Sequence, residues 1–478
     1  MKTLSAYLSS LFRKKHLDTI MAQNKSATLK KTLGAFDLVL IGIGAIIGVG
    51  IFVLTGTIAA NITGPAISAS FVIAGAVCIC TALVYGELAT MIPVSGGAYT
   101  FSYVVIGEFF AWIVGCCIII VTSLGSCLVA VGWSGYLVGG LASAGINIPA
   151  ELTAIPSAGG IVNLPAMIIV GLITAMLVRG TKESVKLNSF LVLIKMLVIA
   201  TFVIFAAPHF DIKHWDNYLP YGYDGVVTGA ASLFVAFAGF EQIASAAEET
   251  KNPKRDLPLG ICGSVIIVTI VYIAIGGMLT GIVDYKLLDN AEPIAFALRE
   301  NGISIGSTLV TIGALGGMPA VILANIFGLS RVIFSMSRDG IIPSAFAKLN
   351  PKTKAPRFAL VFCGTAIAIL SGTAPMSLIT DLMNMSLLFV FAATGLCAII
   401  MRVKKPELAR PFKCPMLYPL ATVTIAACGY LIYDLCVKSD YVIDIIAIVG
   451  IFALGIYKLY GRQNSMLNPR SRRYLSTA

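Results

Sequence analysis

Charged residues are scarce in this chain: Asp, Glu, Lys and Arg make up 12% of its 478 residues, against about 25% in soluble domains. Apolar residues make up 58%, and the mean hydropathy is +0.91. This composition excludes a soluble globular protein and predicts an all-α protein that crosses a lipid bilayer many times. The net charge of +11 then reflects basic loops on one side of a membrane, and indicates no nucleic acid partner.

Signatures of several other protein classes are also missing. The chain has no GxxxxGK[ST] motif, which argues against an ATP-driven pump encoded by this chain alone, and no HExxH motif. It has three histidines, and its eleven cysteines form no CxxC pair at metal-ligand spacing. We expect the cysteines to be small core residues, and we expect no enzyme activity, no metal and no other cofactor.

Twelve apolar segments are long enough to cross a bilayer, because about 20 apolar residues cover roughly 30 Å of hydrocarbon. They are residues 36–60, 65–89, 109–137, 160–178, 187–207, 226–247, 258–282, 307–336, 357–374, 377–401, 416–436 and 442–460. If the basic tail 1–32 is cytoplasmic, 29 of the 34 Lys and Arg residues fall on the cytoplasmic side. A missed or invented segment would destroy this asymmetry. We therefore predict twelve helices with both termini cytoplasmic, in a plasma membrane, and a bacterial inner membrane fits the lack of long loops.

The first apolar segment contains features that oppose each other. It is long enough to span, yet its centre holds four glycines, at positions 42, 44, 48 and 50. Each glycine costs a helix interior up to about 1 kcal/mol relative to alanine. A break at that depth must face protein or a water-filled cavity, as in the broken helices that form the midplane sites of secondary transporters. The alternative is a packing face of small residues between two helices.

A second interrupted segment, 226–247, has a predicted break near Phe237–Gly239, followed by Glu241. The interrupted segments are the first and the sixth, so equivalent features recur at an offset of five segments. This spacing predicts two inverted five-helix repeats, 33–207 and 225–401, with a site between the paired breaks. Residues 414–460 would add two more helices, and 461–478 a second cytoplasmic tail.

Lys195 is the one basic residue in the middle of an apolar segment. A charged lysine at that depth is costly, and burial favours loss of its proton. We interpret it as a proton carrier, or as a fixed cation at a place where a sodium ion would otherwise bind. The alternative is a lysine whose ammonium group reaches the membrane interface.

Four long runs carry a resemblance to a known family: GIGAIIGVGIFVLTG at 42–56, YGELATMIPVSGGAYTFSYVVIGE at 85–108, VAFAGFEQIASAAEETKNPKRDLPLGI at 235–261 and SRDGIIP at 337–343. On these runs the chain resembles the amino acid–polyamine–organocation superfamily, and within it the bacterial permeases of the cationic amino acid transporter family. The resemblance covers about 28–462. It implies a leucine-transporter-like fold, with two inverted five-helix repeats, two extra helices, and breaks in helices 1 and 6.

The resemblance also implies roles for individual residues. A substrate carboxylate would meet the backbone N–H groups of Gly48, Val49 and Gly50, and a substrate ammonium group the carbonyls of both breaks. In this chain those carbonyls belong to Ile46, Val235, Ala236 and Ala238. An aromatic residue of the sixth helix, Phe237 or Phe240, would gate the site, and Lys195 matches a fifth-helix lysine of proton-coupled relatives.

Two departures from the family pattern bear on the substrate. Relatives often have Ser or Thr where this chain has Val49, and an acidic residue in the third helix where this chain has Val121. Without that carboxylate a cationic side chain would lack a partner, and an unpaired cation in a closed pocket costs several kcal/mol. We therefore predict small or medium neutral L-amino acids, with Met318 limiting pocket size.

The leading hypothesis is proton-coupled uptake of a neutral L-amino acid by alternating access. Two alternatives stay open. One is an exchanger of cationic amino acids or polyamines, for which Glu241 offers the only acidic pocket residue. The other is a nutrient sensor that keeps the fold without net flux. The sequence also leaves open whether a small accessory membrane peptide is a partner. A channel is disfavoured, since no ring of polar residues repeats along any segment.

Overall fold

The computed structural model describes residues 12–15, 33–92, 96–179, 185–350, 356–438 and 440–468. Within these ranges the regular structure is helical, apart from one isolated bridge between Leu33 and Thr250. Helices satisfy their own backbone hydrogen bonds, which is what the interior of a bilayer requires.

The α-helices follow the apolar segments of the sequence. They are α3 (Ala35–Ile46), α4 (Thr55–Ile58), α5 (Ile67–Met91), α6 (Gly97–Val105), α7 (Glu108–Ser143), α8 (Leu164–Val178), α9 (Val185–Ala206), α10 (Gly222–Leu233), α11 (Pro253–Ile282), α12 (Pro293–Glu300), α13 (Ser304–Arg338), α14 (Arg357–Thr373), α15 (Met376–Lys404), α16 (Leu417–Lys438), α17 (Asp440–Ile456) and α18 (Arg462–Asn464).

Shorter helical pieces of other geometry join or extend these helices. The π-helical pieces are Gly50–Leu54, Ala59–Thr63 and Tyr457–Gly461. The 3-10 pieces are Gly64–Ala66, Ala150–Leu152, Pro156–Ala158, Ala207–His209, Ile212–Trp215, Phe234–Phe237, Phe240–Glu249, Tyr285–Leu287 and Ser344–Ala347. Such pieces often mark functional positions inside a helix.

Nine helical stretches among the described residues are long and apolar enough to cross a membrane. They are Gly50–Met91, Glu108–Ser143, Phe190–His209, Gly222–Ala244, Pro253–Ile282, Ser304–Arg338, Met376–Lys404, Leu417–Val437 and Ile443–Asn464. Three apolar helices are shorter: Ala35–Ile46, Leu164–Val178 and Arg357–Thr373. The chain is therefore a polytopic helical membrane protein. Each of the twelve predicted segments falls on one or more of these stretches, while twelve crossings and the inverted repeats stay predictions.

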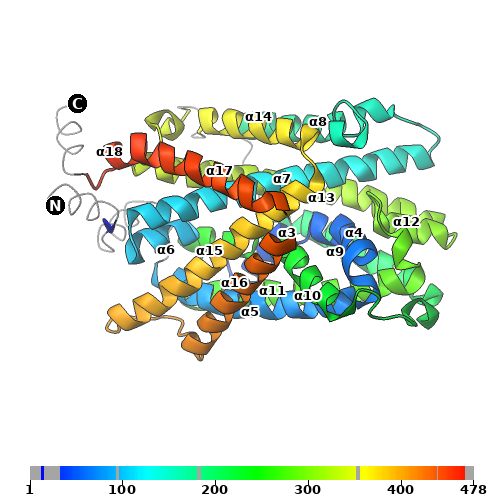
Figure 1. Ribbon diagram of the computed structural model, residues 1–478, viewed down its shortest axis with the longest axis horizontal. Coiled ribbons are helices and arrows are strands. Elements are labelled where there is room, and N and C mark those ends of the chain that lie inside the picture. The colour runs from blue at the N-terminus through cyan, green and yellow to red at the C-terminus, as the bar shows by residue number, and fades with distance from the viewer. Residues whose placement is uncertain are drawn as a thin grey trace.

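The long helices pack side by side along one direction (Figure 1). α13 packs along α7, and α11 packs along both α3 and α5. α8 and α14 form a pair at one edge of the bundle, whereas α6 and α18 lie at one end of it and α12 at the other. α3 ends at Ile46 and α10 at Leu233, and both of these residues are buried in the interior.

α9 shows how the sequence separates the lipid-facing surface from the interior. The side chains of Phe190, Leu193, Leu197 and Ile204 are all at least 59% exposed, and their spacing keeps them near one face of the helix. Lys195 is only 1% exposed. The cation therefore points into the protein, and the alternative in which it reaches the membrane interface does not fit this structure.

The cysteines behave as core residues. All eleven are free thiols, six of them buried and five partly buried. This agrees with the expectation from their positions inside apolar segments.

Candidate substrate site

The first break lies between α3 and the helix that follows it. α3 ends at Ile46, and Ile47 leaves the helical region with a ψ of 103°. The chain bends at Gly48 and becomes helical again from Val49. The first N–H groups of a helix have no partner inside it, and this end of a helix carries a partial positive charge. The break therefore offers a site for an anionic group.

The second break lies at Ala238 and Gly239, between the two 3-10 pieces that follow α10. Ala238 is extended, with a ψ of 137°, and Gly239 has a φ of +126°, which favours glycine. A Cβ at Gly239 would stand 2.8 Å from the carbonyl carbon and oxygen of Ala45 in α3. The N–H of Gly239 donates to Oε2 of Glu241 at 2.9 Å. Glycine is thus required here by both conformation and space.

The two breaks touch each other. A Cβ at Gly50 would stand 2.5 Å from Cβ and 2.7 Å from Cα of Ala236. The hydroxyl group of Tyr272, in α11, lies 3.1 Å from the carbonyl oxygen of Ile46 and 2.8 Å from that of Ala236. One buried tyrosine therefore joins the carbonyls of the first break to those of the second.

Lys195 supports the first break from behind. Its Nζ donates to the carbonyl oxygens of Gly44 at 2.9 Å and Ile47 at 3.0 Å. These carbonyls belong to the last turn of α3 and to the break itself, where backbone acceptors lose their helical partners. The aliphatic part of the lysine packs against Gly317 of α13, where a Cβ would stand 2.9 Å from its Cγ. The lysine thus connects α9 and α13 to the broken helix.

A cavity opens between the two breaks. Its atom-free space, part of it continuous with solvent, is about 480 Å³. Residues from both breaks, α7, α13 and α15 line it: Ala45, Ile46, Gly48, Val49, Gly50, Leu54, Val121, Thr122, Gly125, Leu128, Val129, Val235, Ala236, Ala238, Gly239, Glu241, Gln242, Val321, Asn325 and Met383.

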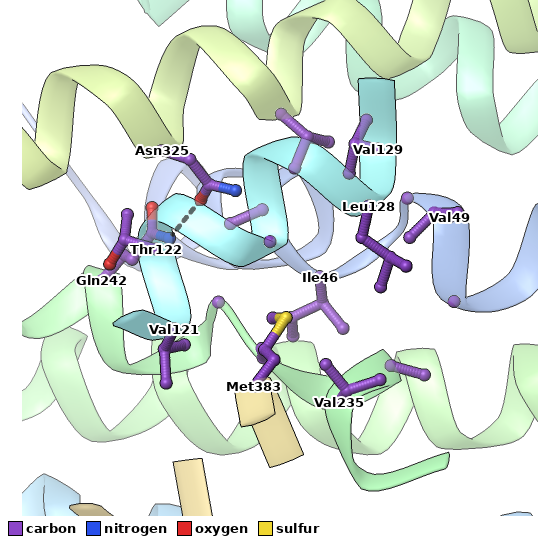
Figure 2. A pocket seen from close by; sticks show the side chains of 18 of the residues that line it. Ile46, Val49, Val121, Thr122, Leu128, Val129, Val235, Gln242, Asn325 and Met383 are labelled. Carbon is purple, nitrogen blue, oxygen red and sulfur yellow. Dashed lines mark hydrogen bonds between the residues drawn. The ribbon is translucent and has the colours of Figure 1, made fainter. Parts of the chain in front are cut away.

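The walls of the cavity divide by polarity, as Figure 2 shows. Aliphatic side chains and Met383 cover most of the lining, whereas Thr122, Gln242 and Asn325 gather at one end. Nε2 of Gln242 donates to Oδ1 of Asn325 at 2.9 Å. The cavity therefore combines a backbone cradle, an apolar chamber and one polar wall.

Most of the residues predicted from the sequence meet in this cavity. Those that line it are Ile46, Gly48, Val49, Gly50, Val121, Val235, Ala236, Ala238 and Glu241. Lys195 and Met318 are buried but do not line it. Met383 of α15 borders the cavity, and a role of Met318 in limiting its size stays a prediction.

The two aromatic residues predicted as gates pack away from the cavity lining. The Phe237 ring packs edge-on against Tyr272, with 5.3 Å between ring centroids. The Phe240 ring stacks at a tilt on Phe391 of α15, at 4.9 Å. Both phenylalanines are fully buried. In this conformation neither covers the cavity, so a gating role would require one of them to move.

Sequence reasoning missed several residues of the site. Tyr272, Gln242 and Asn325 are polar groups inside apolar segments, which is itself a signal of function. Thr122 and Met383 carry no such signal, because Thr is common in membrane helices and Met in any apolar core. Contacts between distant parts of the chain bring all five residues to the site.

Comparisons with known proteins agree with this architecture. Residues 33–453 match the amino acid permease family. The branched-chain amino acid permease of Bacillus subtilis is 41% identical over 465 residues, covering 96% of this chain and 99% of that protein. The methylthioribose transporter of the same organism is 38% identical, covering 96% and 100%. A vacuolar cationic amino acid transporter of Arabidopsis thaliana is 31% identical, covering 84% and 68%.

A helical membrane protein with a cavity between two broken helices, whose relatives are named permeases and transporters, is a transporter and not an enzyme. The match over almost the whole chain defines it further: the protein belongs to the amino acid permease family, in the amino acid–polyamine–organocation superfamily. The resemblance found from the four sequence runs is thereby confirmed.

Replacing Tyr272 by phenylalanine should weaken substrate binding by about 5- to 150-fold. The change removes the hydroxyl group that lies between the carbonyls of Ile46 and Ala236, and the buried carbonyl that accepts its one proton loses this donor at a cost of about 1–3 kcal/mol. The measurement is substrate affinity in purified protein. Tyr221→Phe is the matched control, because that hydroxyl donates to Ala60, away from the cavity. Equal effects of both variants would contradict the bridging role.

Proposed function

We propose that this protein is a secondary active transporter that takes up neutral L-amino acids together with a proton, by alternating access. The supporting observation is that one cavity places the start of a helix next to the backbone of a second break and an apolar chamber. An amino acid has the matching parts: an anion, a cation and an uncharged side chain.

The two charged groups of the substrate would bind to backbone. Its carboxylate would accept hydrogen bonds from the N–H groups of Gly48, Val49 and Gly50, where the helix dipole favours an anion. Its ammonium group would donate to carbonyls of the two breaks, among them those of Ile46 and Val235. Backbone recognition of this kind leaves the choice of side chain to the rest of the cavity.

The side-chain chamber favours a small or medium neutral substrate. Val121, Leu128 and Met383 border it, and an unpaired cation against such groups costs several kcal/mol. Glu241 is the acidic residue of the lining, and its carboxylate already accepts the N–H of Gly239. The name of the branched-chain amino acid permease points in the same direction.

Lys195 is the proposed proton-coupling residue. In the ammonium form its Nζ holds the carbonyls of Gly44 and Ile47, and thereby holds the first break in place. A deprotonated amine donates more weakly and carries no charge, so loss of the proton would loosen this end of α3. Proton release would thus be linked to movement of the helix that binds the substrate.

Alternating access would then move the parts around the cavity. Phe237 or Phe240 would close over the bound substrate, and two inverted repeats, 33–207 and 225–401, would supply the moving groups. We infer a bacterial inner membrane with both termini in the cytoplasm. The excess of Lys and Arg in the predicted cytoplasmic loops supports this orientation.

Uptake into liposomes tests the proposal. Purified protein is reconstituted, and uptake of labelled valine, alanine and arginine is measured with and without an inward proton gradient. We expect gradient-driven uptake of valine and alanine, and none of arginine. Unlabelled methylthioribose serves as a competitor, because a relative of similar identity is named for that substrate.

The other outcomes identify the alternatives. Arginine uptake that does not depend on the proton gradient would indicate an exchanger of cationic amino acids. Binding of valine without flux would indicate a sensor. Inhibition of valine uptake by methylthioribose at lower concentrations than by unlabelled valine would indicate that a sugar thioether is the preferred substrate. The polar wall of Thr122, Gln242 and Asn325 supplies hydrogen-bonding partners for it.

A further inference from the structure

The amide group of Asn325 is held in one orientation at the wall of the cavity. Its Oδ1 accepts a hydrogen bond from Nε2 of Gln242 at 2.9 Å. Because the oxygen of an amide is thereby engaged, its Nδ2 must point the other way. Figure 2 shows this nitrogen directed away from Gln242, along the cavity wall. Among the described residues none accepts a hydrogen bond from Nδ2, although the Asn325 side chain is only 8% exposed.

The space in front of this nitrogen is kept open. Nδ2 lies beside Gly125 of α7, where a Cβ would stand only 3.4 Å away. Any larger residue at position 125 would crowd the amide, and Met383 also stands within 3.0 Å of that Cβ position. Both Gly125 and Asn325 line the cavity. A small ligand in the cavity can therefore reach the Nδ2 group.

The amide stands close to the place proposed for the substrate carboxylate. Val321 precedes Asn325 by one turn of α13, and its Cγ2 stands 3.5 Å from a Cβ built on Gly48. One helical turn is about 5.4 Å. Asn325 therefore lies one helical turn beyond the residue that packs beside Gly48, and both Val321 and Asn325 line the cavity.

We propose that Asn325, oriented by Gln242, donates a hydrogen bond to an acceptor atom on the substrate side chain. The site then favours a neutral amino acid that carries a hydroxyl group, such as threonine, over an apolar one of the same shape, such as valine. This inference rests on the proposed function. Asn325 is the residue that determines this preference, and Gln242 is its positioning residue.

The expected preference follows from what an unpaired donor costs. When valine occupies the cavity it displaces water from Nδ2 and offers no acceptor in return, whereas threonine replaces the lost hydrogen bond. A hydrogen bond of this kind is worth about 3- to 10-fold in affinity. Allo-threonine exchanges the hydroxyl and methyl positions, so a donor in a fixed place should also distinguish threonine from allo-threonine.

The experiment is displacement of labelled alanine from the purified full chain by threonine, allo-threonine and valine. In the wild type, threonine should compete about 3- to 10-fold better than valine and better than allo-threonine. In Asn325→Leu, and in Gln242→Leu, the ratio of threonine to valine affinity should fall to about one. Ile326→Val, on the same helix but buried away from the cavity, is the control and should keep the wild-type ratio.

Three results would overturn the inference. The first is a wild type in which valine competes as well as threonine. The second is a ratio of threonine to valine affinity that is unchanged in both leucine variants. If those variants do not fold, equal competition by threonine and allo-threonine in the wild type overturns the inference instead. The third is a wild type that binds no amino acid at all, in which case the proposed function fails as well, and the two failures are thereby told apart.

Discussion

Lys195→Ala is expected to abolish the dependence of amino acid uptake on an inward proton gradient. The substitution removes two hydrogen bonds, to the carbonyls of Gly44 and Ile47, and with them a titratable group that contacts the first break. These carbonyls are buried, and each one left without a partner costs about 1–3 kcal/mol. Without the ammonium group, binding or release of a proton would no longer change the hydrogen bonding of the broken helix.

The measurement is the ratio of valine uptake with and without the gradient, in liposomes that contain equal amounts of folded protein. The ratio should be about one in Lys195→Ala. Lys213→Ala is the matched control, because Lys213 is exposed in the 3-10 piece after α9 and should keep the wild-type ratio. A Lys195→Ala protein that still accumulates valine in response to the gradient would show that the proton travels through another group.

Sequence and structure agree on the first break for a reason that is local. Four glycines in nine residues weaken one helix whatever surrounds it, and the helix ends at Ile46, inside that run. The same holds for Lys195, because a cation in the middle of an apolar segment is unusual on its own. Local free energies of this kind are visible in the sequence.

The other half of the site depends on pairs that the sequence does not reveal. Tyr272 and Ile46 are 226 positions apart, and Gln242 and Asn325 are 83 apart. Each of these polar groups stands out in its own segment, but only the packing of the helices shows which carbonyl or amide it reaches. Local composition does not reveal such pairings. For this reason the site predicted from the sequence included the residues of the backbone cradle but not those of the polar wall.

The aromatic residues show a different limit. The pattern places Phe237 and Phe240 next to the second break, which is where they are, but the direction of each ring depends on its neighbours. Phe240 packs against Phe391 of α15, and Phe237 against Tyr272 of α11. A transporter has more than one conformation, so the position of a gate in one of them does not follow from the sequence.

Gly50→Ala is expected to lower the rate of uptake by about 5- to 150-fold. A Cβ at this position would stand 2.5 Å from Cβ and 2.7 Å from Cα of Ala236. This Cα belongs to the backbone, so a change of side-chain rotamer cannot relieve the contact. Overpacking of this kind costs about 1–3 kcal/mol, which corresponds to that range of rates. The two breaks would be forced apart, and the N–H groups of the cradle would move with them.

Gly316→Ala tests whether this loss comes from the contact between the breaks or from the general effect of alanine in a helix. No atom lies within 4 Å of a Cβ at Gly316, so the variant should keep wild-type uptake and a slightly higher melting temperature. Substrate affinity and melting temperature are measured in both variants. If Gly50→Ala retains wild-type affinity, the breaks tolerate separation, and the cradle at Gly48–Gly50 does not hold the carboxylate. If it loses affinity while its melting temperature stays near that of the wild type, the distance between the breaks itself sets the strength of binding.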